Sequence, residues 1–343
     1  MKQKISSVPF LLGLLLMWWP NLALAAPIDE ILAAARKEGV IELYATNNLG
    51  PKGAGELAEA FNKKYGLNIS VRYSTGPNFT ADVAKVITRA AAGLLPEWDV
   101  MAVTDAHHGS LWLRKLHERF DYRKVGVDPK VINYDNGVVS YAHQISLPAY
   151  NKNVLPPQDV PTTWEDLVDP KWKGGKLGMA TTTHPLARLA TGPWGEEKTT
   201  RYVKALADQR PMLGPPGEVS SRLQIGEILI AITLTDTYIY AAKRSGAPLV
   251  FAEKVDPVIA AAWQAGVLKG AQHPNAGFLF ATFLTSPEAQ PLWEKYTGQT
   301  SAFIPGTNTY KFAQGRRMVY MSQEQAQLLD RLDREYAKTL GFR

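Results

Sequence analysis

Residues 138–150 read VVSYAHQISLPAY, a long β-rich run that interrupts an otherwise regular alternation of helices and short strands. Before it, helices and strands are predicted in turn at 28–38, 40–45, 55–65, 69–73, 81–92 and 98–103. After it, strands are predicted at 176–180 and 229–234 and helices at 184–191, 199–208 and 219–225. Helices alternating with strands of this length form right-handed β-α-β units around a mostly parallel sheet. The sequence therefore predicts two α/β lobes, one on each side of residues 138–150.

The chain is predicted to cross between these lobes more than once, which gives a hinge and a cleft. A strand at 258–268 and a helix at 275–285 return it to the first lobe. We therefore assign residues 26–138 and 265–300 to lobe 1, and residues 139–264 and 301–343 to lobe 2. The last helix, 323–340, begins at the capping box Ser322-x-x-Gln325. An apolar stripe predicts that this helix packs on a lobe; its members are Leu328, Leu332, Tyr336 and Leu340.

The first 25 residues have the order of a cleavable export signal. Lys2 and Lys4 precede an apolar run at 8–19, and the small-x-small pattern Ala23-Leu24-Ala25 follows. The run is too short to span a bilayer, which takes about 20 residues. The chain has no cysteine to carry a lipid anchor. We expect cleavage after Ala25 and a soluble periplasmic protein that is not a lipoprotein.

Composition excludes several classes of protein. The 343 residues are 45% hydrophobic and 20% charged, as in ordinary soluble domains, and not as in disordered or polytopic membrane chains. Lys and Arg number 38 against 32 Asp and Glu, for a formal charge of +6. The basic residues are scattered and form no stripe, so we expect no nucleic-acid partner.

Candidate ligand-binding residues lie in the loops that follow the predicted strands. In open parallel sheets, ligands bind beyond the carboxyl ends of the strands, where loops lead into helices. These loops are rich in small hydroxyl and amide residues, which can bind an anion together with the free N–H groups of a helix, or simply cap their own helix. The candidates are Thr46, Asn47, Ser74, Thr75, Gly76, Asp105, Thr182, Thr183, Ser220, Asp236 and Tyr238.

Two clusters suggest a metal. Asp105 is followed by His107 and His108, but adjacent histidines on a helix point about 100° apart and do not easily face one ion. Tyr238 and Tyr240 share a face only if their segment is extended. The sequence carries no G-x-S-x-G, H-E-x-x-H or Walker motif, so we expect no enzyme and no required cofactor.

Ordered sequence blocks resemble the periplasmic substrate-binding proteins of ABC importers, most closely the ferric-ion-binding branch. The blocks are Tyr150-Asn151-Lys152-Asn153-Val154, Pro161-Thr162-Thr163-Trp164-Glu165-Asp166-Leu167, Asp169-Pro170-Lys171-Trp172-Lys173-Gly174, Gly226-Glu227, Gly246-Ala247-Pro248, Lys269-Gly270-Ala271, His273-Pro274-Asn275-Ala276 and Ser286-Pro287-Glu288. The resemblance spans the whole mature chain. It implies a type II fold of two lobes that closes on its ligand and then docks on a membrane permease.

The same resemblance bears on the ligand. The iron branch carries two consecutive tyrosines before the Gly-Ala-Pro, and the matching positions here are Thr237 and Tyr238. The branch's anion-binding loop falls on 181–183, which keeps its hydroxyls. The ligand is therefore either ferric iron with an anion, held by Tyr238, or a small oxyanionic organic solute.

Three hypotheses follow for the function. The first is a monomeric solute-binding component of an ABC importer, with permease subunits and their ATPase as partners. The second is an exported metal-dependent hydrolase that uses Asp105 with His184 or His107. The third is a sensory module of the same fold that presents its ligand to a membrane receptor.

Overall fold

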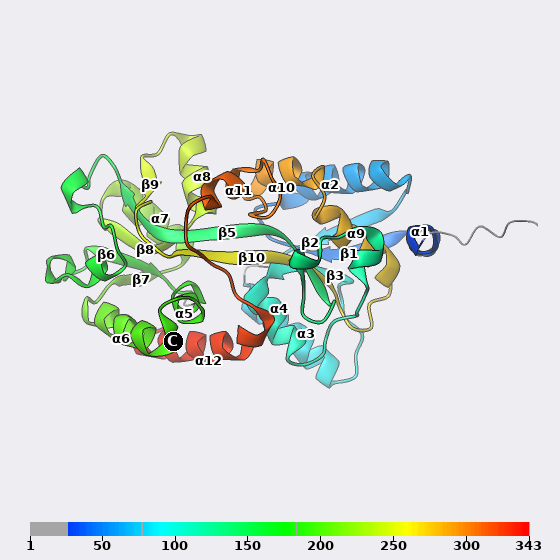
Figure 1. Ribbon diagram of the computed structural model, residues 1–343, viewed down its shortest axis with the longest axis horizontal. Helices are drawn as coiled ribbons and strands as arrows, with labels where there is room; N and C mark the ends of the chain where they lie inside the picture. The colour runs from blue at the N-terminus through cyan, green and yellow to red at the C-terminus, as the bar shows by residue number, and fades with distance from the viewer. Residues whose placement is uncertain (1–26, 77, 183, 343) are drawn as a thin grey trace, which may run out of the picture.

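The computed structural model describes residues 27–76, 78–182 and 184–342, so the predicted signal peptide at 1–25 and Thr183 lie outside the described residues. These residues form one mixed sheet of 11 strands with helices on both faces (Figure 1). The main strand order is β2-β1-β3-β10-β5-β8-β6-β7. None of the helices in these ranges is long and apolar enough to cross a membrane.

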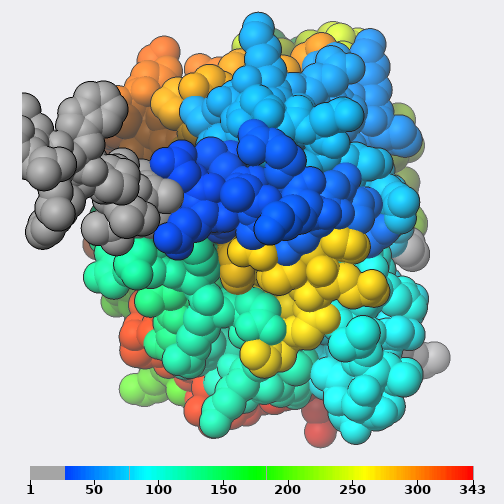
Figure 2. Space-filling model, turned by 90° about the vertical axis from the view of Figure 1, so that its right-hand side faces the viewer, coloured from blue at the N-terminus to red at the C-terminus, as the bar shows by residue number. Residues whose placement is uncertain are grey.

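Lobe 1 is built on three parallel strands, β1 (Val40–Tyr44), β2 (Ser70–Ser74) and β3 (Val100–Thr104). Its helices are α1 (Pro27–Glu38), α2 (Gly50–Tyr65), α3 (Phe79–Ala91), α4 (Asp105–Trp112), α9 (Pro274–Leu284) and α10 (Ala289–Thr297). A core of buried aromatic and aliphatic residues joins α1, α2, α9 and α10, with Phe61 packed edge-on against Phe280 and Phe283. Figure 2 shows this end of the molecule, with α1 in dark blue across its middle.

Lobe 2 repeats the arrangement. Its parallel strands are β6 (Leu177–Ala180), β7 (Met212–Gly214) and β8 (Ile230–Thr235). Its helices are α5 (His184–Thr191), α6 (Gly195–Asp208), α7 (Pro216–Ile225), α8 (Asp236–Ser245) and α12 (Ala326–Thr339). The remaining elements are the strands β4 (Ile132–Asn133), β9 (Leu249–Phe251) and β11 (Met318–Val319) and the short helix α11 (Asn308–Ala313). A second buried core cluster covers this half.

Two long strands, β5 (Val138–Asn151) and β10 (Val258–Val267), run antiparallel through both halves (Figure 1). The register along them fixes where the lobes meet. Thr104, at the end of β3, pairs with Trp263, which pairs with Ala142 of β5. Thr235, at the end of β8, pairs with Ser146 of β5 and approaches from the opposite direction. The carboxyl ends of β3 and β8 therefore face each other, about 13 Å apart along β5 at about 3.3 Å per residue.

The predicted two-lobed α/β fold is confirmed, whereas the exact lobe boundaries stay a prediction. Three helices start three or more residues before the sequence expectation. Helix α2 begins at Gly50, with Pro51 in its first turn, and not at residue 55. Helix α6 begins at Gly195 and not at residue 199. Helix α7 begins at Pro216 and not at residue 219, because Pro216 is well suited to the first turn of a helix.

The C-terminal helix lies under both halves. The capping box of Ser322 and Gln325 is present and opens a short 3-10 turn before α12. The buried face of the α12 segment consists of Ala326, Leu329, Leu332, Tyr336 and Leu340, whereas Leu328 of the predicted stripe is only partly buried. A Cβ at Gly109 would lie 3.0 Å from the Cβ of Ala326, so glycine lets α4 of lobe 1 approach this helix closely.

We predict that Leu332→Ala lowers the free energy of unfolding by about 2–5 kcal/mol, the cost of a cavity at a fully buried leucine. Leu328→Ala is the matched control on the same helix, and its loss should be clearly smaller because that side chain is only partly buried. Urea denaturation followed by circular dichroism measures both. Equal losses for the two variants would contradict the packing described here.

Candidate functional site

Asp105 occupies the point where lobe 1 meets the crossing strands. It is the first residue of α4, directly after β3. Its carboxylate accepts hydrogen bonds from the N–H groups of Ala106 at 2.8 Å and of Ala262 in β10 at 3.1 Å. Both of its oxygens also pair with the guanidinium of Arg188 on α5 of lobe 2, one of them at 2.9 Å. The two side chains are 2% and 1% exposed, so this is a buried, bidentate ion pair between the lobes.

Asp236 occupies the equivalent point of lobe 2. It is the first residue of α8, directly after β8. Its carboxylate accepts from the N–H of Ile145 in β5 at 2.9 Å and from the side-chain amide of Gln299 at 2.7 Å. Gln299 follows α10 of lobe 1, is fully buried, and also donates to the Thr237 hydroxyl at 2.9 Å. Burial raises the pKa of Asp236 from 3.8 to about 7, against the lowering effect of these hydrogen bonds.

The two aspartates thus have matching surroundings. Each opens the helix that follows an inner strand, each binds an N–H of a crossing strand, and each meets a side chain of the other lobe. The structure gives both carboxylates partners within the protein, a role that the sequence analysis did not assign to them.

The lobe 1 loops after β1 and β2 lie side by side. Thr46 is buried, and its carbonyl accepts from the Tyr73 hydroxyl at 2.7 Å, while Asn47 beside it is exposed. Ser74 is half-buried, with its hydroxyl 3.4 Å from the Leu43 carbonyl, and Thr75 is exposed. Gly76 lies against a contact between the Tyr44 hydroxyl and Asp82, where a Cβ would be 1.9 Å from the carboxylate. Only glycine fits there.

The lobe 2 candidates are more dispersed. Thr182, at the end of β6, is half-buried, and Thr181 before it is exposed. Ser220 lies inside α7 because that helix starts at Pro216, so the expectation that it lies in a loop before the helix is wrong. Tyr238 on α8 packs against the cluster of Val219 and Leu223, and burial raises the pKa of its phenol.

The residues of the two suggested metal clusters do not face one common point in the structure. Tyr238 and Tyr240 lie on a helix and do not share a face; the Tyr240 hydroxyl donates to the Lys295 carbonyl at 3.3 Å. His107 bonds the Thr104 hydroxyl at 2.8 Å, whereas His108 bonds His117 at 3.0 Å. Within the described ranges, no group of three or more His, Cys, Asp or Glu residues is placed to hold a metal ion.

Several residues at the crossing escaped the sequence analysis. Arg188 lies among the apolar residues of α5. A charged side chain at such a position indicates a buried partner of opposite charge, and this signal could have identified it. Phe79 contacts the rings of Trp263 and His107 at 5.8 and 5.6 Å and covers the end of the lobe 1 sheet.

The His107 ring lies 5.8 Å from that of His184 across the lobes, beside a pocket of about 70 Å³. Burial lowers the pKa of His107 to about 3.

This architecture, with strand ends of both lobes converging on two crossing strands, is that of the two-lobed type II periplasmic binding proteins. The family model described as bacterial extracellular solute-binding protein matches residues 56–311, and the chain belongs to this family. It is a family of binding proteins and not of enzymes. A curated relative from Haemophilus influenzae, described as an uncharacterized protein, is 30% identical over 147 residues. That match covers 40% of this chain and 41% of the relative.

Three solved structures illustrate the likeness in fold. Iron-bound HitA from Pseudomonas aeruginosa matches with a TM-score of 0.71 at 18% identity, over 87% of this chain and 99% of that one. Trichodesmium FutA with iron and citrate matches with a TM-score of 0.68 at 19% identity, over 88% and 98%. AgtB from A. tumefaciens R10 with agropinic acid matches with a TM-score of 0.66 at 17% identity, over 88% and 99%. Two of these structures hold iron and the third holds agropinic acid, and at 17–19% identity the likeness shows the fold alone.

We predict that Arg188→Met lowers the free energy of unfolding by about 3–5 kcal/mol, because Asp105 then stays buried without its counter-charge. The double variant Asp105→Asn with Arg188→Met should recover most of this loss. Arg201→Met, which breaks an exposed ion pair with Glu197, is the control and should cost at most about 1 kcal/mol. Urea denaturation of the wild type, Asp105→Asn, Arg188→Met and the double variant gives the coupling energy, and additive effects at 105 and 188 would refute the pair.

We predict that Asp236→Asn flattens the dependence of stability on pH. The folded pKa of about 7 exceeds the unfolded value of 3.8, so between these values the folded protein keeps a proton that the unfolded chain releases. The free energy of unfolding of the wild type should therefore fall as pH rises from about 4 to about 7. The variant should lack this part of the decline. Urea denaturation across that pH range tests this, and identical slopes would contradict it.

Proposed function

We propose that this chain is the solute-binding component of an ABC importer, which captures a small ligand between its lobes and delivers it to a membrane permease. The observation that carries the proposal is the register of the crossing strands. It brings the carboxyl ends of β3 and β8, with the helices that follow them, face to face over the middle of β5. Loops at the carboxyl ends of strands are the ligand-binding elements of open α/β sheets.

The lobes close by rotation about the crossing strands. Ala142 and Ser146 of β5 mark the levels of the two strand ends, so the bend is confined to the few residues between them. Asp105 and Asp236 bind N–H groups of the crossing strands in this same stretch, and they keep each lobe attached to the hinge while its outer loops move. Hinge closure around a ligand is a common motion of two-lobed binding proteins.

The ligand is a small solute that carries a carboxylate or another oxyanion. The carboxylates at the strand ends are already bonded within the protein, which leaves hydrogen-bond donors as the groups able to meet a ligand. These donors are the hydroxyl and amide groups of Asn47, Thr75, Thr181 and Thr182, together with the N-terminus of α5. Tyr238 adds a phenol that burial keeps protonated.

Ferric iron with an anion is the second candidate cargo. The likeness in fold to iron-bound HitA and to FutA with iron and citrate favours it. In that case Tyr238 would bind the ion as a phenolate, and the hydroxyls at 181–182 would hold the anion.

Native mass spectrometry of the protein taken quickly from the periplasm, without chelator, tests the proposal and separates the two cargoes. We expect a polypeptide that lacks residues 1–25 and carries the mass of an organic acid. An excess that matches iron, with or without an anion, would assign the second cargo. If the protein neither carries a mass nor gains thermal stability with ferric salts, phosphonates, sugar phosphates or other organic acids, the proposal fails.

We predict that Tyr238→Phe weakens binding of the organic solute by about 1–3 kcal/mol, the range for one buried hydrogen bond. The same change should abolish a ferric site, because phenylalanine cannot ligate a metal. Tyr240→Phe is the matched control on the same helix, and its hydroxyl is turned to lobe 1. Isothermal titration calorimetry with the ligand found by mass spectrometry measures all three proteins, and an unchanged affinity in Tyr238→Phe would remove this residue from the site.

The first binding hypothesis and its sensory variant differ only in the membrane partner. Stimulation of the permease ATPase in proteoliposomes by the loaded protein is the expected result. Binding without such stimulation, together with capture of a membrane receptor domain, would instead favour the sensory role.

A further inference from the structure

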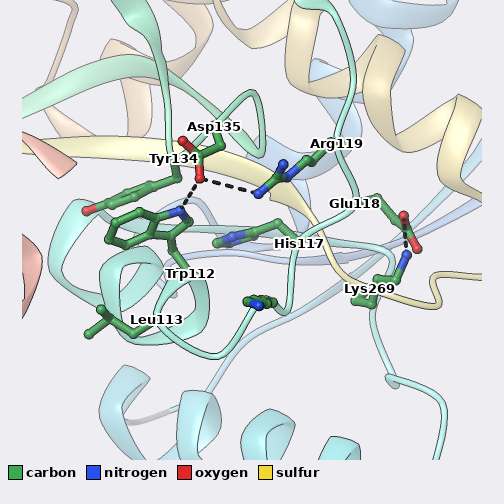
Figure 3. Close-up of a pocket in the computed structure, with 9 residues that line it drawn as sticks. Trp112, Leu113, His117, Glu118, Arg119, Tyr134, Asp135 and Lys269 are labelled. Atoms are coloured by element: carbon green, nitrogen blue, oxygen red, sulfur yellow. Dashed lines mark hydrogen bonds and ion pairs between the residues drawn. The ribbon is translucent and has the colours of Figure 1, made fainter. Parts of the chain in front are cut away.

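A pocket of about 550 Å³ opens on lobe 1, between the end of α4 and the loop that leads into β5 (Figure 3). Its apolar wall is aromatic. The Trp112 and Tyr134 rings lie 5.5 Å apart, and the His117 ring is nearly parallel to that of Tyr134 at 6.3 Å. Figure 3 shows the Glu118–Lys269 ion pair on the opposite side of the His117 ring from Trp112 and Tyr134. None of the predicted solute-binding residues lines this pocket.

The carboxylates around the pocket already have hydrogen-bond and ion-pair partners within the protein. Asp135 accepts from the Trp112 indole N–H at 2.9 Å and pairs with Arg119 at 3.3 Å. Glu118 pairs with Lys269 at 3.0 Å and accepts from the Gly270 N–H. Lys115, in contrast, lines the pocket with its ammonium unpaired in the part of the chain that the structure describes. An occupant of the pocket therefore meets a surplus of positive charge.

The hydrogen-bond chain of two buried histidines fixes what His117 offers. Nε2 of His108 lies 3.1 Å from the Gln264 carbonyl, which can only accept, so this nitrogen carries the proton. Nδ1 of neutral His108 is then an acceptor, and it receives the proton of His117 Nε2 at 3.0 Å. This leaves Nδ1 of His117 as an acceptor that has no partner in the described residues. Because this atom is fully enclosed by the protein, an occupant of the pocket cannot reach it, and His117 contributes a neutral ring and no hydrogen bond. Burial lowers the pKa values of both histidines, which keeps them neutral.

The backbone around the pocket is held in an unusual conformation. Tyr134, Asp135 and Asn136 are consecutive residues with φ of +53°, +56° and +66°, and Lys115 has φ of +58°. Residues other than glycine rarely take this left-handed form, and structures that keep it usually do so at functional sites. Here it sets the positions of an aromatic wall, an acid that orients Trp112, and the unpaired lysine.

We propose that this pocket is a second ligand-binding site, for a flat aromatic carboxylate. The partly exposed ring of Trp112, with buried Tyr134 packed against it, binds the aromatic face, and Lys115 binds the carboxylate. The site is separate from the solute site between the lobes and does not depend on the proposed transport function.

Isothermal titration calorimetry of the mature wild-type protein with indole-3-acetate tests the proposal, because this probe combines an aromatic ring with a carboxylate. We expect binding that weakens about tenfold or more for indole, which lacks the carboxylate. Lys115→Gln should weaken indole-3-acetate by about tenfold. Lys124→Gln, on an exposed lysine of the same lobe outside the pocket, is the matched control and should bind normally.

Two further variants keep the test decisive. Trp112→Leu should remove binding of indole-3-acetate, and a thermal melt confirms that the variant is folded. Tyr238→Phe should leave this affinity unchanged, because Tyr238 is at the other site. The proposal is overturned if indole-3-acetate does not bind, if loss of the carboxylate or Lys115→Gln has no effect, or if Tyr238→Phe weakens binding as much as Lys115→Gln does.

Discussion

The buried ion pair of Asp105 with Arg188 is the contact on which the arrangement of the two halves depends. Asp105 opens a helix of lobe 1, Arg188 lies on a helix of lobe 2, and an N–H of β10 binds the same carboxylate. Desolvating two charges costs as much as their attraction returns, so the pair contributes little net stability, whereas separating it would be expensive. It therefore selects one orientation of α5 against α4. The hydrogen bond between Asp236 and Gln299 also joins the two lobes, at the other crossing strand. Its electrostatic cost is lower because the Gln299 side chain carries no charge.

The partners that Asp105 and Asp236 have within the protein bear on which ligand the cleft could bind. A loop that ends in Thr-Asp before a helix offers both an acceptor and donors, and the sequence alone cannot say which of them faces a ligand. Once the carboxylates are bonded to N–H groups and to side chains of the opposite lobe, the remaining hydroxyls, amides and helix N–H groups all donate. Such donors favour an anion, which supports the proposed class of ligand. The argument rests on the internal partners of two residues and not on any net charge of the chain.

The fold could be predicted from the sequence because the alternation of helices and strands is a local property of the chain. Glycine-terminated helices and short apolar strands predict two parallel lobes, and the long run at 138–150 marks the crossing between them. Partners far apart in the chain leave no such mark. Arg188 lies 83 positions from Asp105, so Asp105 resembled a metal or ligand donor until its partner was visible. Helix starts failed for a different reason: Pro216 favours the first turn of a helix, so Ser220, expected in a loop, lies inside α7.

The pocket on lobe 1 is joined to the interlobe contact by one side chain. The Tyr134 ring forms its wall, and the Tyr134 hydroxyl donates to the backbone carbonyl of Asp105 at 2.7 Å. The left-handed loop that holds Tyr134 leads directly into β5, and Gln323 of the C-terminal segment bonds the next residue, Asp135. An occupant of the pocket therefore contacts a ring that is fixed to the ion pair and to a crossing strand. Linkage requires that any preference of this occupant for one lobe orientation be matched by an equal preference of that orientation for the occupant. Under the proposed function the solute also acts on lobe orientation, so the two proposed sites would share one coordinate, with the Tyr134–Asp105 hydrogen bond as the physical connection between them.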